Sequence, residues 1–117
     1  MNKVSIFPIM HLPEFDTDHE IVEELIESLE KNKISLEDRD VIVITQKIIS
    51  KVEGRKIDIS KEDIEEVIKN ESLQIIRKRG ETVIAKTKHG FICANAGIDK
   101  SNIEEGSALL LPEDPDR

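Results

Sequence analysis

The chain has 117 residues, of which 36% are charged, and its formal net charge is −8. This length predicts one domain that buries roughly two-thirds of the surface of the unfolded chain, around a core of Ile, Leu and Val because the only aromatic residues are three Phe. The negative charge argues against nucleic acid as a partner, because proteins bind it mainly by neutralising phosphates, and the lack of any run of roughly 18 apolar residues argues against a membrane span.

The first part of the chain predicts a strand, a helix and a second strand. Residues 4–9 have strand character. Thr17 and Glu20 have the spacing of a capping box, and apolar residues then recur at helical spacing, which predicts a helix over about residues 18–31. Residues 40–45 are β-branched and apolar on both faces, which predicts the central strand, buried between two layers.

The second part of the chain predicts a further helix and several short strands. Ser60 and Asp63 resemble a helix start, and apolar residues follow at helical spacing. Short strands are expected at residues 73–76, 82–85, 91–94 and 108–111. This mixture without strict alternation indicates an α+β fold, with a mixed sheet and two or three helices. We expect a single domain over residues 1–111, and a polar tail or the start of a linker at residues 112–117.

The change from strand to helix character after Thr45 predicts a site for an anion. Gln46 and Lys47 fall in the first turn of a helix that begins at the carboxyl end of a strand. Free backbone N–H groups and the helix dipole favour phosphate at such a position. Lys47 and Lys51, four residues apart, fall on one face of this helix. The alternative is that both lysines are ordinary surface charges, and spacing alone does not decide between the two.

The sequence HGFICANAGIDKSN, residues 89–102, places a lone carboxylate in neutral surroundings. No carboxylate or ammonium group occurs in it before Asp99. Gly97 permits a turn with positive φ or a close approach of the backbone. Asp99 is a candidate ligand for Mg²⁺ or Mn²⁺, because such ions take one or two protein carboxylates and complete their shell with water and phosphates. The alternative is that Asp99 caps a turn over Ser101 and Asn102, and the two roles are compatible.

Two other reactive residue types are interpreted as structural. Cys93 lies in an apolar strand and is interpreted as a small buried hydrophobe. It is the one cysteine of the sequence, so an internal disulfide is impossible and a cytoplasmic setting is expected. His89 precedes a glycine in a turn and is interpreted as structural or solvent-facing. The sequence has no Walker loop, dinucleotide-binding glycine motif, zinc-type spacing or serine elbow.

Four stretches together resemble the amino-terminal half of coenzyme F420-0:L-glutamate ligases. They are IFPIMHLPE (residues 6–14), ITQKIISKVEGR (44–55), HGFICANAGIDKSN (89–102) and LLLPEDPD (109–116), in the order of that family and at similar spacing. The resemblance implies a ligase that uses GTP and a divalent metal to activate the terminal carboxylate of coenzyme F420-0, a phospholactyl deazaflavin, as an acyl phosphate. The amine of L-glutamate then attacks, which leaves a γ-linked glutamyl tail, GDP and phosphate.

The resemblance also implies roles for individual residues and partners. Contact with GTP is implied for residues of three motifs: Leu12, Pro13, Glu14, Phe15, Gln46, Lys47, Lys51 and Asn102. Asp99 is implied as a ligand of Mg²⁺ or Mn²⁺, K⁺ is a further expected ion, and the catalytic residues are unknown. The implied partners are coenzyme F420-0, L-glutamate and GTP, together with a second copy in a homodimer or a complementary carboxy-terminal half.

The sequence departs from the family pattern in two respects. Members of the family are about twice this length, and the expected second half would carry further metal-binding carboxylates and nucleotide contacts. The stretch between Arg55 and Glu62 is also shorter than in the family. Three hypotheses remain open: the amino-terminal part of a GTP-dependent ligase, a non-catalytic module that binds nucleotide or deazaflavin phosphate, and an interaction module that pairs through its sheet edges with another copy.

Overall fold

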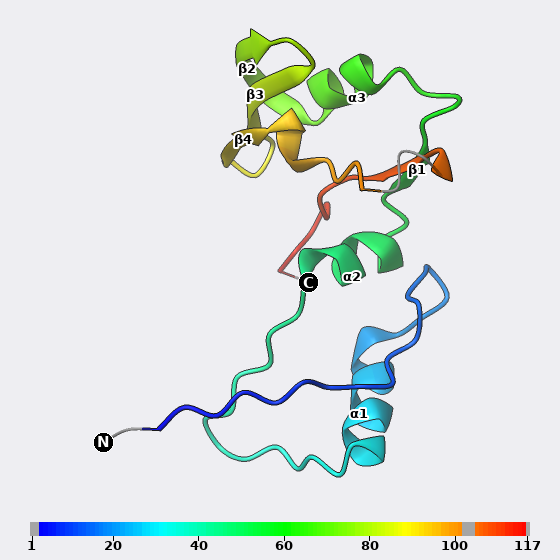
Figure 1. The fold of residues 1–117 in the computed structure, drawn as a ribbon, viewed down its shortest axis with the longest axis vertical. Helices are drawn as coiled ribbons and strands as arrows, with labels where there is room; N and C mark the ends of the chain where they lie inside the picture. Colours follow the sequence, from blue (N-terminus) through cyan, green and yellow to red (C-terminus); the bar gives the residue numbers. More distant parts are fainter. Residues whose placement is uncertain (1–2, 102–104, 117) are drawn as a thin grey trace.

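The computed structural model describes residues 3–101 and 105–116, and it confirms the α+β class (Figure 1). Its longest helix among the described residues has 11 residues, too short to cross a membrane. The helices are α1 (Ile21–Lys31), α2 (Gln46–Val52) and α3 (Ile64–Asn70), with a 3-10 turn η1 (Asn95–Gly97). The strands are β1 (Lys56–Asp58), β2 (Ser72–Arg79), β3 (Thr82–Thr87), β4 (Ile92–Ala94) and β5 (Ser107–Leu109).

The strands form two small antiparallel sheets rather than one mixed sheet. One sheet has the order β2-β3-β4, which confirms three of the predicted strands. The other pairs β1 with β5. A continuous apolar run predicted β5, whereas β1 has a single apolar residue, Ile57, between Lys56 and Asp58. A strand so short carries no periodic signal, so its existence depends on its pairing with β5.

One apolar core joins the β2-β3-β4 sheet, α3 and the segment around β5. Val67 and Ile68 of α3 pack in the same cluster as Val83 and Ala85 of β3, because both faces are apolar at the period of their element. The remaining members of the cluster come from the turn before Asp99 and from the β5 segment: Ala96, Ile98, Ala108 and Leu110. This core therefore fixes the loop that carries Asp99 relative to β5.

A side-chain cap confirms the predicted start of α2, whereas α3 is capped by Asp63 and not by Ser60, the first residue of the predicted capping box. Thr45 Oγ1 accepts a hydrogen bond from Lys47 N at 3.4 Å, so α2 begins where the sequence predicted. Asp63 Oδ1 accepts one from Glu65 N at 3.0 Å at the start of α3. Both caps satisfy N–H groups that have no partner within the helix.

The capping box predicted for α1 is wrong. Glu20 is the N-cap residue of this helix and its side chain makes no cap hydrogen bond. The reason is a preceding turn, in which the Asp16 carboxylate accepts from Asp18 N at 2.9 Å and the Asp16 carbonyl accepts from His19 N at 3.3 Å. This turn holds Thr17 outside the helix.

Residues 4–9 and 40–45 do not form the strands that their composition predicts, so the central buried strand is a wrong prediction. In the part of the chain that the structure describes, residues 4–9 and 41–44 have no backbone hydrogen-bond partner. Val41 and Val43 are 83% and 90% exposed. The Cα radius of gyration is 17.3 Å, whereas a compact domain of this length has about 13 Å. A β-branched run becomes a strand only when a neighbour pairs with it, and these two runs have none.

Arg55 connects the end of α2 to the rest of the molecule. Its Nη2 donates to Glu71 Oε2 at 2.6 Å and its Nε donates to the Leu111 carbonyl at 3.0 Å. The Arg55 carbonyl accepts from Leu110 N at 3.0 Å. Both charged groups are largely buried, where an ion pair is screened less than at the surface. The network holds α2 beside the β5 segment.

The turn Asn95–Gly97 reverses the chain before Asp99. All three residues have positive φ, and Asn95 Oδ1 accepts from Val83 N at 3.1 Å. Gly97 has φ of 73°, and a Cβ on it would lie 2.7 Å from Leu111 Cδ1. The structure thus confirms both uses of this glycine that the sequence allowed, the positive φ and the close approach.

We expect Gly97→Ala to lower the free energy of unfolding by about 2–4 kcal/mol, because left-handed strain adds to the clash with Leu111. Gly80→Ala is the matched control, since Gly80 has φ of 59° and nothing within 4 Å of an added Cβ. It should lose only about 1 kcal/mol. Urea denaturation measures both values. Equal losses in the two variants would show that Gly97 is not closely packed.

Candidate functional site

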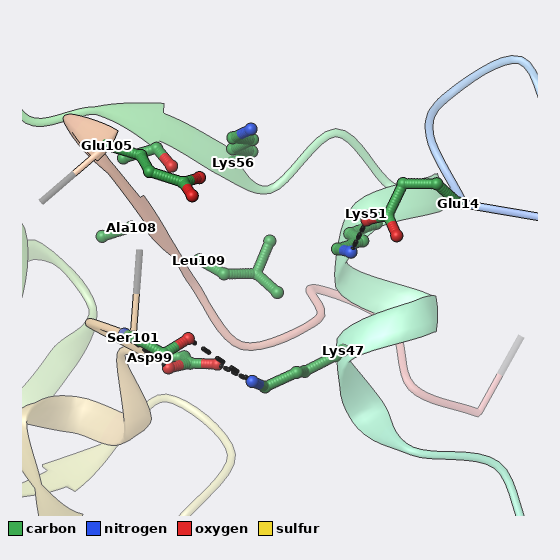
Figure 2. A pocket seen from close by; sticks show the side chains of 10 residues that line it. Glu14, Lys47, Lys51, Lys56, Asp99, Ser101, Glu105, Ala108 and Leu109 are labelled. Carbon is green, nitrogen blue, oxygen red and sulfur yellow. Dashed lines mark hydrogen bonds and ion pairs between the residues drawn. The ribbon is translucent and has the colours of Figure 1, made fainter. Parts of the chain in front are cut away.

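A pocket of about 350 Å³ opens between α2 and the β1–β5 pair (Figure 2). Its walls come from segments that are far apart in the sequence, and its lining is mainly charged and polar. The lining residues are Glu14, Lys47, Lys51, Lys56, Asp99, Ser101, Glu105, Ser107, Ala108 and Leu109. Figure 2 shows the two α2 lysines reaching into this space toward carboxylates on other segments.

Helix α2 supplies Lys47 and Lys51, as the sequence predicted. Their spacing of four residues places them on one face of the helix, and both line the pocket. Ser50 on the other side of α2 is fully buried, and its hydroxyl donates to Gln46 Oε1 at 2.9 Å. Gln46 is therefore engaged within its own helix and does not line the pocket.

Asp99 faces α2 from the loop that follows η1. Lys47 Nζ lies 2.5 Å from Asp99 Oδ2, and Ser101 N donates to Asp99 Oδ1 at 2.9 Å. The hydrogen bond from Lys47, helped by that from Ser101, lowers the pKa of Asp99 to about 2. The carboxylate is therefore ionised at neutral pH. The structure confirms that Asp99 caps a turn, and the carboxylate also faces the pocket, so the two predicted roles remain compatible.

Glu14 is the one member of residues 12–15 that lines the pocket. Its carboxylate forms an ion pair with Lys51, and this hydrogen bond lowers the pKa of Glu14. Leu12 and Pro13 are half-buried outside the pocket lining. Phe15 is buried and packs edge to face on His19, with ring centroids 5.7 Å apart. Phe15 therefore anchors the loop that presents Glu14.

The remaining predicted residues lie elsewhere. Asn102 falls outside the described residues. His89 stacks on Phe91, with ring centroids 6.4 Å apart, and neither residue lines the pocket. Cys93 is half-buried in β4 opposite Ala85, so it is less buried than the sequence predicted.

Four polar residues of the pocket were not predicted as site residues: Lys56, Ser101, Glu105 and Ser107. Lys56 is brought in by the pairing of β1 with β5, where it lies opposite Leu109. Asp99 also pairs with Leu109, through hydrogen bonds of 2.8 Å and 3.0 Å. Neither contact has a local signal, because Leu109 lies 53 positions after Lys56 and ten positions after Asp99. The sequence indicated Ser101 only as a residue of the turn that Asp99 caps.

The pocket supplies some of the oxygen ligands that a hard divalent cation needs. Asp99, Ser101 and Glu105 offer carboxylate and hydroxyl oxygens, which Mg²⁺ and Mn²⁺ prefer. Within residues 3–101 and 105–116, no group of three or more His, Cys, Asp or Glu side chains is placed to hold a metal by itself. Such an ion would therefore complete its shell with water and with oxygens of a bound phosphate.

The family profile and the individual relatives that match this chain point to the same protein family. The profile of the F420-0:Gamma-glutamyl ligase family matches residues 9–117. The coenzyme F420:L-glutamate ligase of Methanothermobacter thermautotrophicus is 34% identical over 97% of this chain and 52% of its own length. The protein of the same name from Archaeoglobus fulgidus is 35% identical over 97% of this chain and 50% of its own length.

A third relative of the same name, from Methanocaldococcus jannaschii, is 42% identical over 69% of this chain and 39% of its own length. The chain thus spans about half the length of the curated relatives that it matches. Because the family profile covers nearly every residue and relatives above 30% identity cover almost the whole chain, the chain belongs to the F420-0:gamma-glutamyl ligase family.

Proposed function

We propose that this chain forms the part of a GTP- and metal-dependent ligase that binds the nucleotide phosphates and the metal, and that the ligase adds L-glutamate to coenzyme F420-0. The observation that carries the proposal is the convergence of Lys47, Lys51 and Asp99 on one pocket. Three relatives named coenzyme F420:L-glutamate ligase support the reaction class and its two substrates. A phosphate-binding and ion-binding pocket is what a nucleotide-driven ligation requires.

The proposed reaction has two steps. A carboxylate oxygen of coenzyme F420-0 attacks the γ-phosphorus of GTP, so that the bond to the β-phosphate oxygen breaks and GDP leaves. The product is an acyl phosphate. The neutral amine of L-glutamate then attacks the acyl carbon, phosphate leaves, and the nitrogen loses a proton to give an amide between coenzyme F420-0 and glutamate. Lys47 and Lys51 stabilise the negative charge that develops on the transferred phosphoryl group.

The charge of the pocket supports dependence on a metal. Three lysines line it, and so do three carboxylates, those of Glu14, Asp99 and Glu105. A bare triphosphate would meet carboxylates as well as lysines, and two unit charges 4 Å apart interact by about 4 kcal/mol near a protein surface. Asp99 would hold a divalent cation, and the charge of that cation would offset the repulsion between the carboxylates and the phosphates. When bound, the ion would also polarise a phosphate oxygen.

The other parts of the active site come from outside this chain. The relatives are about twice as long, so a carboxy-terminal half or a second copy would supply the remaining contacts to GTP, coenzyme F420-0 and glutamate. A cytoplasmic setting and a role for K⁺ belong to the same proposal. One alternative is a module that binds nucleotide or phosphate without catalysing ligation.

We expect Lys47→Ala and Lys51→Ala each to weaken GTP binding, measured by calorimetry with Mn²⁺, by about tenfold or more. A hydrogen bond to a charged group contributes about 1.5–3 kcal/mol, and a tenfold change corresponds to about 1.4 kcal/mol. Lys78→Ala is the matched control, because Lys78 is 50% exposed and ion-paired at 2.7 Å, as Lys47 is 48% exposed and ion-paired at 2.5 Å. Lys78 lies outside the pocket. Equal effects of the three substitutions would place the phosphates elsewhere.

Asp99→Asn should reduce the gain in GTP affinity that Mn²⁺ produces by about tenfold or more. Without Mn²⁺ the same variant should bind GTP at least as well as the wild type, because a carboxylate is lost and Lys47 is released. The amide oxygen still accepts from Ser101 N, so the turn is retained.

The matched control for Asp99 is Asp58→Asn. Asp58 caps the same kind of turn, since its Oδ1 accepts from Ser60 N at 3.0 Å, and it pairs with Lys61 at 3.5 Å. It does not line this pocket. If Asp99→Asn keeps the full response to Mn²⁺, or if Asp58→Asn loses it equally, Asp99 is not a ligand of the ion.

A further inference from the structure

Two runs of strand-forming sequence lie on the surface without a sheet. In residues 41–44 the exposure alternates, with Val41 and Val43 above 80% and Ile42 and Ile44 at 38%. In residues 4–9, Val4, Ile6 and Phe7 are also largely exposed. Alternation at period two is the pattern of a strand with one face covered. Apolar side chains this exposed in one run mark a surface that another polypeptide covers.

The backbone of these runs is available for pairing. In residues 3–101 and 105–116, none of the N–H or C=O groups of residues 4–9 and 41–44 has a backbone partner. A β-branched run with free donors and acceptors is a template for an added strand, and proteins otherwise suppress such edges with charges or proline. Residues 41–44 carry neither a charge nor a proline, whereas residues 4–9 contain Pro8, one position before the end of the run. Figure 1 shows α1 and these two runs set apart from the sheets.

We propose that residues 41–44 and residues 4–9 form strands by pairing with another polypeptide. That polypeptide corresponds to the part of the relatives that this chain does not match. The inference rests on the family and on the unpaired backbone, and it does not require the proposed GTP site. The relatives extend over about twice the matched length. That added length is enough to supply strands, and it is covalently joined to the matched half in each relative.

A second copy of this chain is a poorer occupant. It would bring another net charge of −8 to the contact. It would also bring the same two unpaired runs. If residues 41–44 of the two copies paired with each other, one edge of each strand and both copies of residues 4–9 would still lack a partner. A polypeptide of different sequence can fill both runs at once.

Pairing at residues 41–44 would affect the candidate site, because this run directly precedes α2. The run leads into Thr45, the N-cap of α2, and Lys47 follows in the first turn. A strand held in a sheet fixes the direction from which the chain enters α2. Binding of the other half therefore fixes the orientation of the helix that carries Lys47 and Lys51.

The test uses the unmatched half of the Methanothermobacter thermautotrophicus relative as the probe, co-expressed with this chain as a separate polypeptide. We expect a complex in which amide hydrogen exchange at residues 41–44 slows by about tenfold or more. Val43→Asp should lower recovery of the complex by about tenfold, because it puts a charge on the pairing strand. Val43→Pro should do the same by removing an N–H donor.

Val22→Asp is the matched control, because Val22 is a valine 67% exposed on α1 outside both runs. It should change recovery by no more than about twofold. Since Val43 is exposed, both Val43 variants should keep the circular dichroism and urea midpoint of the isolated chain. The proposal is overturned if no complex forms, if exchange at residues 41–44 is unchanged in the complex, or if protection appears on concentrating this chain alone.

Discussion

The pairing of β5 on both of its edges is the constraint on which the rest of the structure depends. On one edge β1 pairs with β5 and places Lys56 opposite Leu109, and on the other edge Asp99 exchanges two hydrogen bonds with the same Leu109. Arg55 then holds the end of α2 against the β5 segment. Because of these contacts, a lysine from β1, a carboxylate from the loop after η1 and two lysines from α2 line one pocket.

The local parts of this arrangement could be predicted from the sequence, and the long-range parts could not. The cap at Thr45, the lysine spacing on α2 and the positive φ of Gly97 each follow from residues close in sequence. Lys56 has no such signal, because its place depends on a strand tens of residues away. The strand predicted at residues 40–45 was wrong for a related reason. Their composition favours a β-strand, but it does not indicate whether this chain contains a strand that pairs with them.

The exposed strand-forming runs and the internal ion pairs of the pocket both leave groups for which partners outside this chain are proposed. The chain matches about half the length of its relatives, its radius of gyration exceeds that of a compact domain, and its strand-forming runs at residues 4–9 and 41–44 are exposed. The ion pairs of Lys47 with Asp99 and of Lys51 with Glu14 keep the pocket neutral without a ligand. On ligand binding, the lysines would pair with phosphates and Asp99 would bind a divalent ion, so the charges of the pocket would stay balanced.

The proposed phosphate and metal site is tested by calorimetric titration of the wild-type chain with GTP, with and without Mn²⁺. We expect micromolar binding when Mn²⁺ is present and binding weaker by about tenfold or more when it is absent, because Asp99 would hold the ion beside the phosphates. Binding that is equally tight without Mn²⁺ would contradict the role of Asp99. No binding under either condition would contradict the claim that this half holds the phosphate site by itself.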